Sequence, residues 1–173
     1  MRSITLTLVL FIITMLAYSQ NEIVISKIII TGNNITRQDI ILRELTFNEN
    51  NSFSIHELKE KIKESKQNLV NLQLFNFIEI NYSLEEGRVN LTIDVTERWY
   101  FWPYPIVEIS ERNFNSWWDS FSSSNYSDFS RLNYGLFLNW ENFRGRNELV
   151  EFKIRKGFKE HYLFSYQIPY FNK

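Results

Sequence analysis

Three segments in the first part of the chain have the residue pattern of β-strands. Residues 23–31 are rich in β-branched side chains and end at a Gly-Asn-Asn turn. Residues 75–84 and 88–96 follow later and are separated by a Glu-Glu-Gly turn. The last segment alternates strictly, and its apolar side chains share one face: Val89, Leu91, Ile93 and Val95. This alternation predicts a strand with one buried and one exposed face.

Two helices are expected between the first and second of these strands. Thr36 has the character of an N-cap for a short helix that runs to about Leu45. Ser54 and Glu57 have the spacing of a capping box, which predicts the start of a longer amphipathic helix. The resulting β-α-α-β-β order predicts an α+β domain, with two helices over one face of a three-stranded sheet.

The last part of the chain contains three more alternating segments, at residues 132–140, 147–156 and 161–168. Each is about nine residues long, which is the length of a tilted transmembrane β-strand. The first segment places five side chains on its apolar face: Leu132, Tyr134, Leu136, Leu138 and Trp140. Together with short turns and aromatic strand ends, the pattern predicts that residues 132–173 begin an outer-membrane β-barrel. A soluble antiparallel sheet with one wet face has the same period and is the alternative.

The stretch between these two regions shows no clear period. Pro103 and Pro105 favour an extended and stiff connection. The serine-rich residues 116–130 are predicted to form a loop. We therefore expect a domain over residues 20–98, and a linker and loop over residues 99–131 that lead into the barrel strands.

Three strands cannot close into a barrel. An open sheet edge in the hydrocarbon region leaves backbone groups unpaired, at a cost of several kcal/mol each. Single-chain bacterial barrels begin at about eight strands. We therefore expect these residues to be the N-terminal part of a longer protein, the alternative being strands contributed by several subunits.

The aromatic residues are distributed very unevenly. Of 29 Phe, Trp and Tyr residues, two lie in the first 19 positions, five in residues 20–98 and 22 in residues 99–173. This difference supports two physically distinct regions. The charges are nearly balanced, with 19 Lys and Arg against 20 Asp and Glu, so we expect no nucleic-acid partner.

The sequence offers little material for catalysis. It has no cysteine, and its two histidines, His56 and His161, lie far apart in the chain. No nucleophile–base pair, metal-ligand set or phosphate-binding loop is recognisable. We predict neither a metal nor a cofactor, and a protein that is not an enzyme.

The first 19 residues have the layout of a secretory signal peptide. Arg2 precedes a 13-residue apolar run, and Ala17-Tyr18-Ser19 resembles a cleavage site. The run is short for a transmembrane helix, which needs about 20 residues, so a retained N-terminal anchor is the weaker alternative. We expect an exported protein whose mature chain begins near Gln20.

Residues 25–97 resemble a POTRA domain, the periplasmic module of the BamA/TamA outer-membrane assembly family. The resemblance is carried by Ile28-Ile29-Ile30-Thr31-Gly32-Asn33, by the segment 69–75 (Leu-Val-Asn-Leu-Gln-Leu-Phe) and by Val95-Thr96-Glu97-Arg98. The segment 112–118 (Arg-Asn-Phe-Asn-Ser-Trp-Trp), Asn133-Tyr134-Gly135 and Asn142-Phe143-Arg144-Gly145 are similar to the first barrel region of short members with one POTRA domain. Members of this kind continue into a complete barrel, which this sequence does not contain.

The resemblance implies a function in the outer membrane, with the POTRA domain in the periplasm and the barrel in contact with lipid. POTRA domains receive unfolded outer-membrane proteins or periplasmic partner proteins, and strand addition to an exposed sheet edge is the expected mechanism. The expected edge includes Phe75, Asn76, Phe77, Ile78, Glu79 and Ile80. The segment 132–140 is expected to be the first barrel strand and one side of a lateral gate.

Three other classes of function are alternatives. A transporter of the two-partner secretion type shares the POTRA domain and barrel but exports one dedicated substrate. A free periplasmic binding module would make residues 99–173 a soluble β-domain. A barrel-anchored enzyme would need a catalytic domain, of which the sequence shows no sign.

Overall fold

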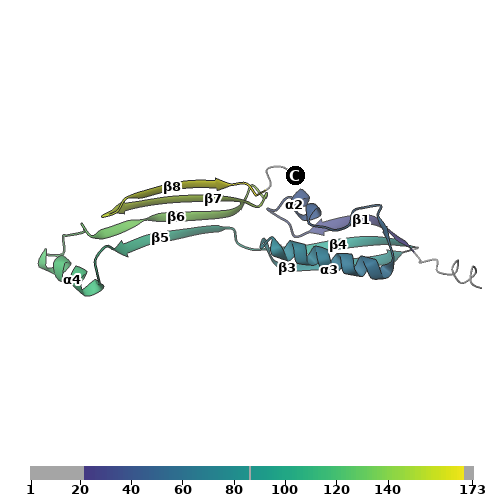
Figure 1. Cartoon of the computed structure of the whole chain (residues 1–173), viewed down its shortest axis with the longest axis horizontal. Helices are drawn as coiled ribbons and strands as arrows, with labels where there is room; N and C mark the ends of the chain where they lie inside the picture. The colour runs from purple at the N-terminus through teal and green to yellow at the C-terminus, as the bar shows by residue number, and fades with distance from the viewer. Residues whose placement is uncertain (1–21, 86, 170–173) are drawn as a thin grey trace, which may run out of the picture. The chain divides into compact units, whose positions relative to one another are not determined.

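The computed structural model describes residues 22–85 and 87–169, so the predicted signal peptide lies outside the described residues (Figure 1). The chain forms two compact units. Of the described residues, the first contains 22–31, 44–71, 78–85 and 87–95. The second contains 32–43, 72–77 and 96–169. The division therefore does not coincide with the boundary at residue 98 that the sequence suggested.

The first sheet contains four strands in the order β2-β1-β4-β3. Their bounds are β1 Ile23–Thr31, β2 Ser52–Phe53, β3 Phe75–Glu85 and β4 Arg88–Glu97. β1 pairs in parallel with β4 and antiparallel with β2. The predicted strands are all present, and the two-residue β2 is an addition that the sequence did not reveal. The predicted α+β fold class is confirmed.

A dry core holds the first unit together. All four inward side chains of β4 predicted from the alternation are buried. They meet β1 and the long helix α3 (Ile55–Asn71), and the buried cluster includes Ile25, Leu58, Val89 and Leu91. Burying such side chains contributes about 1.5–3 kcal/mol each. One face of α3 therefore fixes the position of the helix on this sheet.

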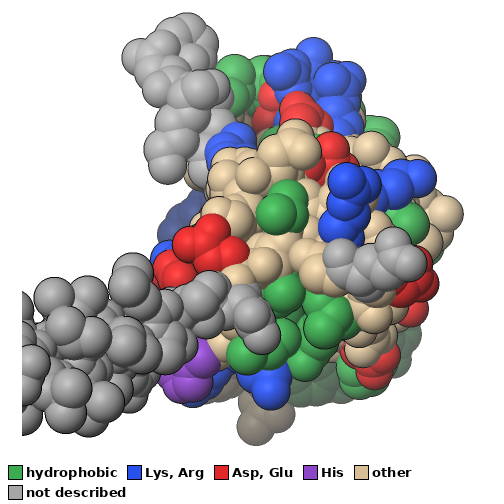
Figure 2. Space-filling model, turned by 90° about the vertical axis from the view of Figure 1, so that its right-hand side faces the viewer, with side chains coloured by type: hydrophobic (Ala, Val, Ile, Leu, Met, Phe, Trp, Pro, Cys, Tyr) green, Lys and Arg blue, Asp and Glu red, His purple; other side chains and the backbone are tan. Residues whose placement is uncertain are grey.

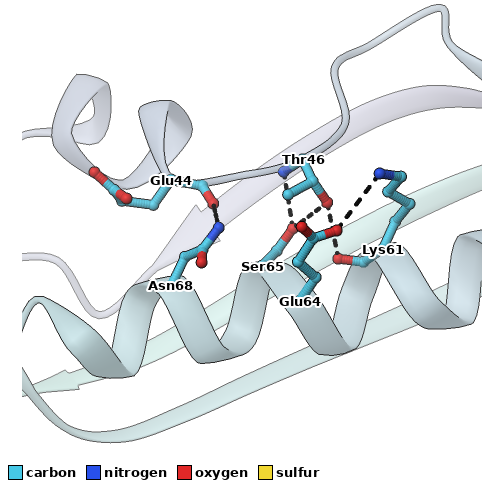
Figure 3. A network of polar contacts seen from close by, with 6 residues as sticks. All are labelled: Glu44, Thr46, Lys61, Glu64, Ser65 and Asn68. Carbon is cyan, nitrogen blue, oxygen red and sulfur yellow. Dashed lines mark hydrogen bonds and ion pairs between the residues drawn. The ribbon is translucent and has the colours of Figure 1, made fainter.

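Polar contacts fasten α3 to the loop that precedes β2. Of the two hydrogen bonds of the predicted capping box, the structure has the one in which the backbone N–H of Glu57 donates to the Ser54 hydroxyl, at 3.2 Å. Further along, the Thr46 N–H donates to the buried Ser65 hydroxyl at 2.9 Å, and the Thr46 hydroxyl donates to the Lys61 carbonyl at 3.1 Å (Figure 3). The backbone groups of this loop are thereby satisfied by the helix.

The short helix α2 spans Gln38–Arg43 and belongs to the second unit. Its predicted N-cap is wrong in detail, because the hydroxyl of Thr36 binds Tyr100 and Asn142. Ile40 of α2 packs with Leu74 and Tyr100 in a second buried cluster. Thr36 therefore contributes to tertiary structure more than to the start of its helix.

The second sheet contains four antiparallel strands in the order β5-β6-β7-β8 (Figure 1). Their bounds are β5 Phe101–Ile109, β6 Leu132–Phe143, β7 Glu148–Gly157 and β8 His161–Gln167. The three predicted strands are confirmed within a few residues. The prediction of residues 99–131 as linker and loop is wrong at two places, since residues 101–109 form β5 and residues 114–123 form a helix.

β5 pairs with β6 along its whole length, from Phe101 opposite Trp140 to Ile109 opposite Leu132. The expectation that residues 132–140 are the first strand of this sheet is therefore wrong, because β5 precedes them and occupies the edge. Both faces of β5 carry large apolar side chains, so the strand shows no polar–apolar alternation. Its two prolines also argued against a paired strand.

The helix α4 (Phe114–Ser123) lies between β5 and β6, inside the predicted serine-rich loop. Asn113 caps it, with the side-chain oxygen accepting from the Ser116 N–H at 2.8 Å. Aromatic rings stack along the helix, for example Trp117 on Phe121 with ring centroids 4.9 Å apart. Ring packing at helical spacing thus stabilises a segment of low intrinsic helix propensity.

Within the parts of the chain that the structure describes, no helix is long and apolar enough to cross a membrane. Figure 2 shows one face of the molecule, on which basic, acidic and apolar side chains are interspersed.

Candidate functional site

The first candidate site is the outer edge of β3, where the sequence placed the client-binding strand. β3 is the last strand of its sheet, so one side of its backbone has no neighbouring strand. Phe77 points away from the core and is 72% exposed, whereas Ile78 is buried and Ile80 packs against the core. The structure therefore confirms that these residues form an edge strand, with its apolar side chains divided between core and solvent.

The backbone of β3 alternates in direction along the strand. On β4 the even-numbered residues bond to β3, since the Arg98 N–H donates to the Leu74 carbonyl at 3.2 Å. Side chains directly opposite each other point to the same face of a sheet, so from Phe77 onward the exposed odd-numbered residues of β3 lie opposite the outward even-numbered residues of β4 and bond to them. Ile78, Ile80 and Tyr82 thus offer both N–H and C=O groups to an added strand.

β3 lacks the features that usually protect a sheet edge. It is 11 residues long and contains no proline and no lysine. The opposite edge of the same sheet is different, because β2 and the residues before it cover β1. There, the Ile25 N–H donates to the Asn51 carbonyl at 2.9 Å, and the Ile28 N–H donates to the Glu49 carboxylate at 2.9 Å. Strand addition to the first sheet is therefore possible mainly at β3.

The second candidate site is a buried polar network in the second unit, centred on Asn142. Its side-chain amide donates to the Thr36 hydroxyl at 2.8 Å, and its side-chain oxygen accepts from the Asn147 N–H at 2.8 Å. The Thr36 hydroxyl also lies 3.2 Å from the Tyr100 hydroxyl, which donates to the Leu74 carbonyl at 2.7 Å. Asn142 thereby joins the β6–β7 turn to the segment before α2 and to the start of β5.

Glu97 adds a charged anchor to this network. Its carboxylate accepts from three consecutive backbone N–H groups, those of Asn34, Ile35 and Thr36, at 3.1, 2.9 and 2.6 Å. Hydrogen bonds to a carboxylate are roughly twice as strong as those between neutral groups. The loop before α2 is therefore held by the end of β4.

The β6–β7 turn fits closely against the same loop. The Gly145 carbonyl accepts from the Arg37 N–H at 3.0 Å. Gly145 has φ +72°, and a Cβ atom on it would lie 2.0 Å from the Ile35 carbonyl oxygen. Only glycine meets both conditions, because other residues would clash with this oxygen and would be strained at positive φ.

Burial raises the pKa of the Tyr100 phenol above its usual value, and the nearby negative charge of Glu97 acts in the same direction. The hydrogen bond with Thr36 opposes this shift. The phenol is therefore neutral at physiological pH, as its role as a hydrogen-bond donor requires.

A mostly apolar cavity of about 430 Å³ lies beside the network within the second unit. Both arginines in its lining are paired with carboxylates, Arg98 with Glu141 and Arg144 with Glu148. The lining residues are Ile35, Arg98, Trp99, Tyr100, Phe101, Trp140, Asn142 and Arg144. Because these cations are already neutralised, the cavity offers an aromatic surface more than an anion site.

The second sheet has one apolar and one more polar face, as the alternation predicted. The strand register brings the predicted face of β6 together with side chains of the neighbouring strands. The apolar face includes Phe101, Pro103, Val107, Leu136, Leu138, Trp140, Val150, Phe152, Ile154, Tyr162 and Phe164. The other face includes Asn133, Asn139, Glu151, Lys153, Arg155, His161, Ser165 and Gln167.

Sequence reasoning missed the polar network. The segment 142–145 was noticed as part of a motif, but nothing in the sequence linked Asn142 to Thr36 or Tyr100. Among the described residues, no group of His, Asp and Glu side chains is arranged to hold a metal ion. Strand pairing and buried polar contacts are thus what these sites offer.

Residues 23–98 match the family model of the POTRA domain, described as a surface antigen variable number repeat. The structure is similar to BamA from Haemophilus ducreyi lacking POTRA domains 1–3. The TM-score is 0.60 at 17% sequence identity, over 87% of this chain and 25% of that chain. At this identity the likeness shows the fold.

CdiB from Acinetobacter baumannii gives a TM-score of 0.47 at 12% identity, over 86% of this chain and 26% of that chain. CdiB from Escherichia coli gives 0.40 at 12% identity, over 78% and 22%. No curated protein matches the sequence. The chain thus spans about a quarter of the length of that shortened BamA chain and of the CdiB from Acinetobacter baumannii.

The fold is a POTRA domain followed by a four-stranded antiparallel sheet, as in the matching part of BamA. The resemblance to the BamA/TamA-type family is confirmed, because the family match covers the POTRA domain and the BamA fold extends across most of the chain.

Proposed function

We propose that this chain is part of an outer-membrane assembly protein whose POTRA domain receives unfolded polypeptides by strand addition to β3. The clients are extended segments of outer-membrane proteins or of periplasmic partner proteins. The POTRA domain lies in the periplasm, and the second sheet lies in the outer membrane with its apolar face towards lipid.

The observation that carries this proposal is the open edge of β3. Pairing with backbone groups supplies affinity without demanding a particular client sequence. The exposed Phe77 adds an apolar contact beside the edge. An unprotected edge of this length is a liability unless it has a partner, which supports a role in binding.

The second sheet supports the membrane part of the proposal. Several large side chains of its apolar face are exposed, Val107 and Phe164 most of all. Such a face is costly in water and favourable in lipid. We place the gate strand of the barrel at β5, the edge of this sheet, in place of residues 132–140.

The test replaces Tyr82, whose backbone faces the open edge and whose side chain is exposed, with proline. Tyr82→Pro removes one outward N–H donor and leaves the bonds to β4 intact. One hydrogen bond contributes about 1 kcal/mol, so we expect the affinity for an unfolded outer-membrane protein to fall about fivefold or more. Binding is measured by fluorescence anisotropy with a labelled client.

Tyr82→Ala is the matched control, because it removes the same side chain and keeps the N–H group. It should bind the client more tightly than Tyr82→Pro. Circular dichroism shows whether each variant is folded. A folded Tyr82→Pro variant that binds as tightly as Tyr82→Ala would refute strand addition at β3. Proline at Ile78 or Ile80, the first choice from sequence, is less suitable because these residues pack in the core.

A further inference from the structure

The outer edge of β5 differs from that of β3 in its backbone chemistry. Two hydrogen bonds flank β5: the Tyr100 carbonyl accepts from the Glu141 N–H, and the Ser110 N–H donates to the Arg131 carbonyl, each at 2.8 Å. The register between them has no shift. Even-numbered residues of β5 therefore turn their backbone groups towards β6, and odd-numbered residues turn theirs to the outer edge.

Both prolines of β5 fall on odd positions. Pro103 and Pro105 thus cost the sheet no hydrogen bond with β6, but each removes an N–H donor from the outer edge. The ring carbon that replaces each hydrogen also projects towards the place where an added strand would lie. The two missing donors are consecutive along the edge, so the break is in the middle of the strand.

A third edge group is already occupied. The indole N–H of Trp99 donates to the carbonyl of Phe101, which is an outward-facing acceptor of the same edge. Only Val107 and Ile109 keep both an outward N–H and an outward carbonyl that no neighbouring side chain is seen to bind within the described residues.

We infer that Pro103, Pro105 and Trp99 make the outer edge of β5 a discontinuous pairing edge, which accepts an extended client strand at residues 107–109 and refuses it across residues 101–105. The inference rests on the proposed function, since it concerns where the clients taken up at β3 can pair next. β3 holds a strand along its length, whereas β5 holds one only by a short end. A strand joined to β5 is therefore released easily.

Disulfide trapping tests this difference, because the chain has no cysteine of its own. Tyr82 of β3 and Tyr104 of β5 each lie in the edge strand of their sheet and are 41% and 46% exposed. Each is replaced by cysteine in a separate variant. The probe is a ten-residue synthetic peptide of alternating apolar and polar residues with one central cysteine, incubated in a glutathione redox buffer.

We expect Tyr82→Cys to form the mixed disulfide and Tyr104→Cys to form it at less than about one-fifth of that yield. Adding Pro103→Val and Pro105→Val restores both donors and should raise the yield at position 104 about fivefold or more. The yield at position 82 should not change with the valines. Valine is a strong strand former, and circular dichroism checks that the sheet is retained.

Equal yields at positions 82 and 104 in the chain with its prolines would overturn the inference. So would a folded valine variant with no increase at position 104. A failure of Tyr82→Cys to react would instead count against the proposed function. The comparison of prolines with valines at position 104 would still decide whether the prolines interrupt pairing at the edge of β5.

Discussion

The two sheets of this protein use the same sequence pattern for opposite purposes. β4 and β7 both alternate between apolar and polar residues. In β4 the apolar side chains are buried beneath α3, whereas in β7 Phe152 remains exposed. A period of two thus states which side chains share a face, but not what covers that face. In the first sheet the cover is the protein itself, and in the second we propose that it is lipid.

The largest expected effect is a loss of stability. It is compared for the same substitution, leucine to alanine, at a buried position in the first sheet and at an exposed position in the second. Leu91 is 0% exposed and Leu136 is 39% exposed. Leu91→Ala should destabilise the first unit by about 2–5 kcal/mol, because it removes buried contacts and leaves a cavity. Leu136→Ala should cost less than half as much.

Hydrogen exchange with mass spectrometry measures both changes in detergent, segment by segment, since the two units need not unfold together. Equal losses of protection in β4 and β6 would contradict the distinction between the sheets.

A charge on the apolar face of the second sheet should give the next largest effect. Phe152 and Glu151 are neighbours on opposite faces of β7. Phe152→Arg should weaken membrane association by about 2–4 kcal/mol, whereas Glu151→Arg on the polar face should change it little. Flotation with lipid vesicles measures the bound fraction. If both variants float like the unchanged chain, the alternative of a soluble sheet gains support.

A smaller effect is expected where the second sheet meets the loop before α2. Gly145→Ala should destabilise the second unit by about 1–3 kcal/mol, because the new methyl group collides with the Ile35 carbonyl. Gly87→Ala is the matched control, since Gly87 also has positive φ (+77°) but has open space around its Cβ position. Thermal unfolding followed by circular dichroism reports on both units, because Gly145 lies in the second unit and Gly87 in the first. Equal shifts in melting temperature for the two alanine variants would show that the loss of stability comes from backbone strain at positive φ and not from the collision with the Ile35 carbonyl.

The smallest effect concerns alkaline pH. Because burial raises the pKa of Tyr100 above 10.0 in the fold, its contribution to stability is complete below about pH 10 and is lost as the pH rises through the folded pKa. The unchanged chain should therefore lose stability more steeply above pH 10 than Tyr100→Phe. Urea unfolding at several alkaline pH values measures the slope, with the exposed Tyr134→Phe as control. If the free energy of unfolding falls with pH at the same slope in all three proteins, Tyr100 is not the cause of the alkaline loss of stability.

The sequence was sufficient where one physical rule decided the structure. The alternation in residues 88–96 and 132–168 located the strands, and the capping box located the start of α3. β5 escaped prediction because Trp102, Tyr104 and Ile106 occupy the face where polar residues were expected. The structure also shows that its prolines are compatible with pairing, since they lie on the outward positions.

The helix α4 was hidden by its serines, although Phe114, Trp117, Trp118 and Phe121 have helical spacing and could have revealed it. The network around Asn142 could not be derived, because hydrogen bonds between distant polar residues leave no periodic signal. The edge position of β3 came from the family resemblance, and its exposed face came only from the structure.

The hydrogen bond between Asn142 and Thr36 has a consequence for the order of folding. It closes a loop of 106 residues, whereas the core of the first unit is complete with residues 23–91. A chain made from its N-terminus can therefore bury that core before residue 142 exists. Closing the longer loop costs more chain entropy and requires the β6–β7 turn to be formed. The hydrogen bond of the buried Asn142 amide to Thr36 thus forms late, once residue 142 has been synthesised and the two segments have been brought together.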